Sequence, residues 1–251
     1  MGVNPFHMVS KSPWPLLGSM CGSSLLLGVY YYLCYASIFV LYVSVISLFL
    51  ISFLWWRDVI RESTYQGSHT SVVSSGLYTG FLFFVLSEVM FFFSFFFSFF
   101  FLSLVPSVEL GGWPPVGIEP MSYIGIPLFN TILLISSGVS ITWAHHNLLS
   151  NNSCLSSLLL TIMMGILFLF YQIREYYESS FSMADSVFGS IFFLTTGFHG
   201  LHVLIGVTFL MVVWIRLFLN QMSKHHHVGF EVSSWYWHFV DVIWLFLFVV
   251  V

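Results

Sequence analysis

The sequence predicts an all-α integral membrane protein with seven transmembrane helices, and two observations lead to this fold class. First, 58% of the 251 residues are hydrophobic and only 6% are charged. Soluble domains carry about 25% charged residues, so this chain has too few polar side chains to cover a surface in water. Second, seven apolar stretches, each about 20 residues or longer, are separated by polar or Pro/Gly-rich segments.

The predicted helices form a pair and a group of five. Residues 1–15 precede the pair, whose two helices are separated only by a short turn at 34–37. A polar link at 57–76 follows the pair. The segment 106–125 contains acids, prolines and a tryptophan, and it should form an ordered loop at the membrane surface. We expect one membrane domain over the whole chain, with spans at 16–34, 37–56, 77–105, 126–149, 155–177, 187–217 and 230–251.

The positions of the positive charges predict the orientation of the helices. If the amino terminus lies on side A, all Lys and Arg residues except Arg174 fall at side-A helix ends. An excess of Lys and Arg marks the cytoplasm-like face, so side A is that face and the carboxyl terminus emerges on side B. The side-A cations are Lys11, Arg57, Arg61, Arg216 and Lys224, and acidic residues on side B are Glu109, Glu119, Glu175, Glu178 and Asp185.

The composition and the motifs exclude several classes of function. Six Lys and Arg residues on a net charge of −4 form no basic patch for nucleic acid. The three cysteines lack metal-binding spacing, and we interpret them as packing residues. The sequence contains no phosphate loop, nucleophile elbow or zinc-protease motif. These absences indicate no catalytic site of the soluble type, and the intramembrane histidines leave open a self-contained transporter or redox enzyme.

Glu88 is the single ionisable residue of the apolar stretch 85–105. An isolated charge at membrane depth costs several kcal/mol, so such residues usually have a function. No ionisable residue lies three or four positions away on the same predicted helix. The Glu88 side chain must therefore find a partner on another helix, contact water, or remain protonated.

Other polar side chains also lie inside the predicted helices. His199 and His202 are three residues apart and could share a metal, bond to a neighbouring helix, or handle protons. His238 and Asp241 have the same spacing and could bond to each other on one helix face. Such a bond would satisfy the acid of Asp241 without any catalytic role.

The side-A helix ends carry groups that could meet lipid headgroups or protons. Arg57 and Arg61 follow two tryptophans at headgroup depth. They could hold lipid phosphates, as could Arg216, or they could be ordinary snorkelling cations. The histidines at 145–146 and 225–227 could be simply solvated, form a proton-buffering rim, or bind adventitious metal.

Long motifs over almost the whole chain resemble subunit III of the mitochondrial, aa3-type cytochrome c oxidases. They occur in the same order along the sequence, which is more specific than any single motif. They are HMVSKSPWPL (7–16), WWRDVIREST (55–64), SEVMFFFSFFFSFF (87–100), ELGGWPPVGI (109–118), GVSITWAHH (138–146), EYYE (175–178), FSMADSVFGS (181–190), TGFHGLHVLIG (196–206) and WYWHFVDVIWLFLF (235–248).

The resemblance implies a non-catalytic core subunit of respiratory complex IV in the inner mitochondrial membrane. Its amino terminus would face the matrix and its carboxyl terminus the intermembrane space. The implied partners are subunit I as the main contact, subunit II, small accessory subunits and membrane phospholipids, with assembly into a supercomplex left open. Haem a, haem a3 and copper would belong to partner subunits, so the resemblance implies no metal or other cofactor on this chain besides structural phospholipids.

The resemblance also implies a role for each candidate residue. Helices one and two would splay from helices three to seven and form a V-shaped cleft that holds phospholipids. The chain would support the subunit I core and sustain proton uptake while electrons pass from cytochrome c to oxygen, with Glu88 as a buried carboxylate near the cleft.

His199, His202, His238 and Asp241 would be structural polar residues. Lipid contacts would come from Trp56, Arg61, Glu62, His69, Phe84 and Arg216. Arg174 departs from the family pattern, in which an uncharged residue is expected before EYYE.

Overall fold

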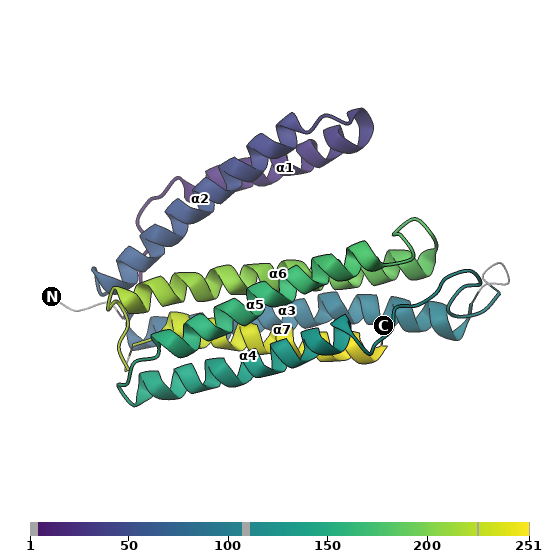
Figure 1. Cartoon of the computed structure of the whole chain (residues 1–251). Coiled ribbons are helices and arrows are strands. Elements are labelled where there is room, and N and C mark those ends of the chain that lie inside the picture. The colour runs from purple at the N-terminus through teal and green to yellow at the C-terminus, as the bar shows by residue number, and fades with distance from the viewer. Residues whose placement is uncertain (1–4, 107–110, 225, 251) are drawn as a thin grey trace. The chain divides into compact units, whose positions relative to one another are not determined.

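The computed structural model describes residues 5–106, 111–224 and 226–250. Glu109 and His225 lie outside these described residues. In the described part of the chain all seven predicted spans are α-helices long and apolar enough to cross a membrane, so the predicted fold class is confirmed (Figure 1). The helices are α1 (Trp14–Tyr35), α2 (Phe39–Thr64), α3 (Ser71–Leu104), α4 (Ile126–Leu149), α5 (Leu155–Glu178), α6 (Val187–Phe218) and α7 (Val228–Val250).

The largest difference from the predicted boundaries concerns the polar link at 57–76. Helix α2 continues to Thr64 and α3 begins at Ser71, so only residues 65–70 connect them. Arg and Glu are good helix formers, and a cation in the last turn, here Arg61, suits the negative end of the helix dipole. Hydropathy marks the part of a helix that lies in hydrocarbon, and the helix itself can extend beyond it.

The chain forms two compact units, with a boundary between Leu77 and Tyr78 inside α3. The first unit contains the antiparallel pair α1 and α2. Gly28 is the buried residue of α1, and a Cβ atom there would lie 2.7 Å from the Cα atom of Leu41. The missing side chain therefore lets the two helix backbones approach closely.

The second unit is built around four helices that contact one another in a closed series: α4 with α5, α5 with α6, α6 with α7, and α7 with α4. Trp237 lies fully buried among them, and its Nε1 donates a hydrogen bond to Ser137 Oγ at 2.9 Å. Gly165 and Gly206 make room for its ring, since a Cβ atom would lie 2.6 Å and 3.0 Å from ring carbons, respectively. Lipid is as apolar as the helices, so the hydrophobic effect does not drive membrane helices together. Small residues at these positions instead allow the close packing that holds them.

Helix α3 contacts this four-helix group through long side chains. The ring of Phe92 lies 5.0 Å from the ring of His202 and 6.3 Å from that of Phe239, while Phe91 lies 5.2 Å from Phe198. These edge-to-face arrangements are favoured geometries for aromatic pairs. The many phenylalanines of α3 thus bridge the distance to α6 and α7.

The described part of the 106–125 segment packs onto the second unit. The ring of Trp113 lies 5.4 Å from the ring of Phe99 on α3 and 5.4 Å from that of Phe188 on α6. These three residues join a small aromatic cluster near the side-B ends of the helices, which also includes Phe181. The segment is anchored there by apolar contact.

Candidate functional site

The polar centre of the second unit is a contact between Glu88 on α3 and His202 on α6. The Oε2 atom of Glu88 lies 2.9 Å from Nε2 of His202, and the two side chains are 22% and 12% exposed. Both residues lie near the midpoints of their helices: Glu88 is residue 18 of 34 in α3, and His202 is residue 16 of 32 in α6. The pair therefore lies near the middle of two membrane spans.

The hydrogen bonds of His202 indicate that His202 and Glu88 share one proton. Nδ1 of His202 lies 2.7 Å from the backbone carbonyl oxygen of Phe198, and a carbonyl can only accept, so Nδ1 carries a hydrogen. Nε2 then has either a lone pair or a second hydrogen. At 2.9 Å from Glu88, one proton must lie between the groups, either on the imidazolium or on the carboxylic acid. The pair has no net charge in either state, which is the arrangement that costs least in an apolar interior.

His199 points to a different neighbour from His202. It is fully buried, and its Nε2 lies 3.2 Å from the backbone carbonyl oxygen of Val240 on α7. Its ring also packs edge-to-face on Phe168, at 5.6 Å. Because His199 faces α7 while His202 faces α3, their ring nitrogens do not converge on one ligand position.

His238 and Asp241 lie on one face of α7 without a hydrogen bond between them. The distance from His238 Nδ1 to Asp241 Oδ2 is 4.0 Å, which is within ion-pair range but longer than a hydrogen bond. Both side chains face Gly138 on α4, where a Cβ atom would lie 2.8 Å from Asp241 Oδ2. Spacing along one helix favoured a direct bond, whereas the contact with α4 sets the positions of these side chains.

In the first unit, two of the candidate lipid-contact residues are joined through the amino-terminal segment. Nε2 of His7 lies 3.2 Å from Oε2 of Glu62, and the His7 ring lies 6.1 Å from the ring of His69. The indole of Trp14 donates a hydrogen bond to Asp58 at 2.8 Å. The side-A end of the helix pair is therefore an organised polar surface.

The remaining lipid candidates differ in exposure. Trp56 is 66% exposed and Arg61 is exposed at the end of α2. In the second unit, Phe84 is 44% exposed and lies 6.4 Å from the ring of Tyr236. Arg216 is only partly exposed in the last turn of α6.

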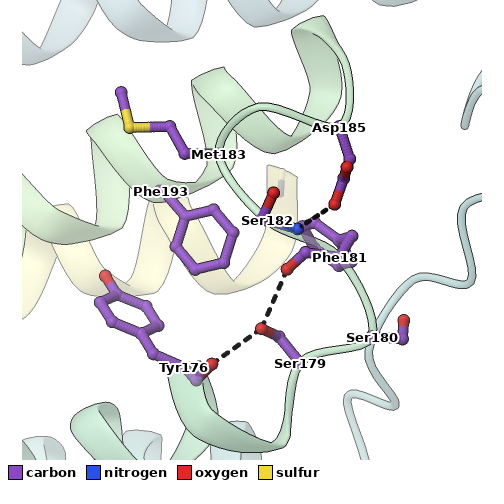
Figure 2. Close-up of a pocket in the computed structure, with 8 residues that line it drawn as sticks. All are labelled: Tyr176, Ser179, Ser180, Phe181, Ser182, Met183, Asp185 and Phe193. Carbon is purple, nitrogen blue, oxygen red and sulfur yellow. Dashed lines mark hydrogen bonds between the residues drawn. The ribbon is translucent and has the colours of Figure 1, made fainter.

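A pocket of about 560 Å³ lies on side B, between the end of α5 and the start of α6. Figure 2 shows its lining, in which the Ser182 backbone N–H donates to the Asp185 carboxylate at 2.6 Å. This hydrogen bond, together with the nearby Ser182 hydroxyl, lowers the pKa of Asp185. None of the residues singled out as lipid contacts or buried polar groups lines this pocket, whose hydrogen bonds shape the turn into α6.

The pairing of Glu88 with His202 was not predicted from the sequence, although one signal pointed to it. Both residues lie near the middle of a predicted span, and spans three and six run in opposite directions across the membrane, so the two residues share a depth. Equal depth does not show which helices are neighbours. The packing of α3 on α6 through Phe91 and Phe92 supplies that information.

Comparison with known proteins gives one consistent result. The family model described as cytochrome c oxidase subunit III matches residues 4–251. Cytochrome c oxidase subunit 3 of Patiria pectinifera is 51% identical over 249 residues, covering 98% of this chain and 96% of the relative. The proteins of the same name from Paracentrotus lividus and Mus musculus are 49% and 50% identical, covering 98% and 97% of this chain and 95% of each relative.

Proposed function

This chain belongs to the cytochrome c oxidase subunit III family, and on that premise we propose that it is a non-catalytic subunit which holds phospholipids and sustains proton uptake by the oxidase core. As a multi-pass subunit of the oxidase, it works in a complex with other subunits. Electron transfer from cytochrome c to oxygen would take place on haem a, haem a3 and copper held by subunits I and II. We place the complex in the inner mitochondrial membrane, with the amino terminus of this chain in the matrix.

The proton part of the proposal rests on the contact between Glu88 and His202. This pair holds one proton that can lie on either partner while the net charge stays zero. Movement of this proton from one partner to the other leaves the pair without net charge, so it avoids the cost of an isolated charge at membrane depth. We propose that the pair lies beside subunit I and supports proton delivery there.

The lipid part of the proposal rests on side-chain chemistry near the side-A helix ends. Arg61 is an exposed cation five residues after Trp56 on the same helix, and aromatic rings with cations at headgroup depth favour phospholipid phosphates and glycerol groups. We propose that Glu62, His69 and Phe84 complete these contacts, together with Arg216.

The lipid contacts can be tested in the intact oxidase that contains this chain. The double variant Arg61→Ala and Arg216→Ala removes two cations that would bind phosphate. We expect the purified complex to lose at least one tightly bound phospholipid per complex in native mass spectrometry. The matched control, Arg57→Ala with Arg174→Ala, removes two exposed cations that are already paired with Asp58 and Glu178. Full lipid retention in the first variant, or equal loss in both, would exclude this lipid site.

A further inference from the structure

A second polar cluster lies at the end of the second unit where α4 ends and α7 begins, which is the end of the connections α4–α5 and α6–α7 in Figure 1. It contains His145 near the end of α4, His227 just before α7, and Glu231 in the first turn of α7. One side-chain ligand atom from each residue lies within 4.8 Å of those from the other two. This cluster is separate in the sequence from the Glu88 pair and from every candidate lipid contact.

The hydrogen bond of His227 fixes which nitrogen faces the cluster. Nδ1 of His227 lies 3.1 Å from the backbone carbonyl oxygen of Ser223, and since that oxygen can only accept, Nδ1 carries the hydrogen. Nε2 lies 3.2 Å from the Oε1 atom of Glu231. In neutral His227 this is a lone pair facing a carboxylate, so a cation or a second proton must lie between them. A carbonyl that holds one imidazole nitrogen is also the usual support of a metal-binding histidine.

His145 adds a third possible metal ligand, whose Nε2 atom has no hydrogen-bond partner in the described part of the chain. Its Nε2 atom is buried without a hydrogen bond, as is Nε2 of His227. The His145 ring stacks on the buried Phe230 at 5.4 Å and meets the His227 ring at 5.8 Å. These contacts place the two imidazole rings beside each other at the end of α4 and the start of α7. Two imidazole nitrogens that have lost water without gaining a hydrogen bond would be stabilised by a shared cation.

We propose that His145, His227 and Glu231 bind one divalent zinc ion, with a solvent molecule as the fourth ligand. Two imidazoles and a carboxylate are a known zinc set, and carboxylate or water alone would suit magnesium and calcium better. Tetrahedral zinc with bonds of about 2.0–2.2 Å separates its ligand atoms by roughly 3.3 Å. The distance of 3.2 Å from His227 to Glu231 already matches, and the three ligand atoms all lie within 4.8 Å of one another, so the site must contract slightly to bind zinc. Glu231 is 27% exposed, which leaves access for an ion and for water.

This site would be structural or regulatory and would carry no electrons, because zinc has no redox chemistry at such ligands. It differs from the family expectation that this chain ligates no metal. A bound ion would tie the end of α4 to the start of α7 on side A. The proposal does not depend on the roles of Glu88 or of the lipid contacts.

The binding test uses the full chain in phosphatidylcholine nanodiscs, first freed of metal with a chelator. Titration with zinc chloride, followed by calorimetry and elemental analysis, should give one saturable ion per chain. His145→Ala and Glu231→Gln should each weaken binding at least tenfold. The matched controls His146→Ala and His226→Ala remove neighbouring exposed histidines and should change the affinity less than twofold. Circular dichroism checks that every variant keeps its helix content.

A second measurement needs no variant. X-ray absorption of zinc bound to the unaltered chain should report two imidazole nitrogens and two oxygen ligands, and cobalt in place of zinc should give the intense visible bands of a tetrahedral site. The proposal is overturned if the chain binds no saturable ion, if only weak adventitious sites are found, or if the His146 and His226 variants lose as much affinity as the cluster variants.

Discussion

At the scale of single residues, the functional chemistry depends on which atom of a histidine carries the hydrogen. His202 and His227 both donate Nδ1–H to a backbone carbonyl four residues earlier, at 2.7 Å and 3.1 Å. In each case Nε2 is directed to a carboxylate on a helix, Glu88 or Glu231. The same local arrangement thus gives a proton-sharing pair in the middle of the helices and a candidate metal ligand at their end.

Replacing Glu88 by Gln tests the proton role. The Gln amide can still donate a hydrogen bond to His202 Nε2, so we expect the free energy of unfolding to change by less than about 1 kcal/mol. The mobile proton is lost, so proton uptake measured in reconstituted vesicles should fall during continuous turnover. Unaltered turnover and proton pumping would remove any proton role for Glu88.

The Glu88→Ala variant serves as the structural control for that experiment. It leaves Nε2 of His202 without a partner in an apolar interior, which costs about 1–3 kcal/mol. Thermal unfolding of the oxidase should therefore separate the two variants, with only the Ala variant strongly destabilised. If both variants lower the unfolding temperature equally, the Gln amide does not replace the stabilising contact that the Glu88 carboxylate makes with His202.

The turn before α6 should depend on pH through Asp185. Its carboxylate accepts the Ser182 N–H, so the pKa of Asp185 is lower in the folded chain than the ordinary value of 3.8. The carboxylate therefore stabilises the turn at pH above that ordinary value, and the contribution is lost as pH falls through the lower folded pKa. Hydrogen exchange of the Ser182 amide should accelerate in acid beyond the intrinsic pH effect. In Asp185→Asn this additional acceleration should be absent, and its persistence would show that another group is responsible.

At the scale of helices, close contact is decided by glycine positions that hydropathy does not distinguish. Gly22 and Gly28 both lie in α1, but a Cβ atom at Gly22 would meet nothing within 4 Å, whereas at Gly28 it would lie 2.7 Å and 2.9 Å from backbone atoms of Leu41. Backbone cannot move aside as a flexible side chain can. Gly28 therefore fixes the crossing of α1 and α2.

Alanine at these two positions should have opposite effects. Gly28→Ala pushes the α1 and α2 backbones apart and should destabilise the pair by about 1–3 kcal/mol. Gly22→Ala removes only chain flexibility and should be neutral or stabilising by about 0.5–1 kcal/mol. Protease resistance of the 65–70 connection and chemical unfolding in detergent would measure both. Equal behaviour of the two variants would contradict the close contact at Gly28.

At the scale of the whole molecule, the chain presents large apolar surfaces that must be covered by lipid or by partner subunits. In the most apolar stretch of each helix, only 6% of the residues are buried in α1, α2 and α3. The buried share is 33% in α4 and α6, 39% in α5 and 50% in α7. Within the second unit, Phe97 and Phe101 are 62% and 63% exposed, whereas Phe92 and Phe168 are almost fully buried. A subunit with such surfaces is suited to work against neighbours in a membrane.

Photolabelling from the lipid phase should reveal these surfaces. In the isolated chain in nanodiscs, a membrane-soluble carbene should label Phe97 and Phe101 and leave Phe92 and Phe168 unlabelled, as read by peptide mass spectrometry. In the intact oxidase, exposed residues that lose their label identify the face covered by partner subunits. Labelling of Phe168 at the level of Phe97 would contradict the packing of the second unit.

Much of the fold followed from composition, for physical reasons that particular residues illustrate. The four spans predicted from 126–149 onward agree with α4 to α7 within two residues at each described end. The prediction was less accurate near Arg57 and Ser71, because polar residues can continue a helix past the hydrocarbon. Glu88 was identified as a candidate from its isolation in an apolar stretch, whereas its partner His202 depended on contacts between distant parts of the chain.

The residues alone indicated a membrane protein of seven helices, in which Glu88 must find a partner, contact water or remain protonated. The costs of burying charge and of leaving backbone groups unpaired in lipid act on each segment separately, so they can be read without knowing the packing. The tertiary structure alone decided the identity of that partner, the contact of Asp241 with Gly138, and the meeting of His145 with Glu231. These contacts depend on which helix faces are neighbours. Lipid is as apolar as the helix surfaces, so hydrophobicity does not select one neighbouring face over another. The fit of small and aromatic side chains between the helices selects it instead.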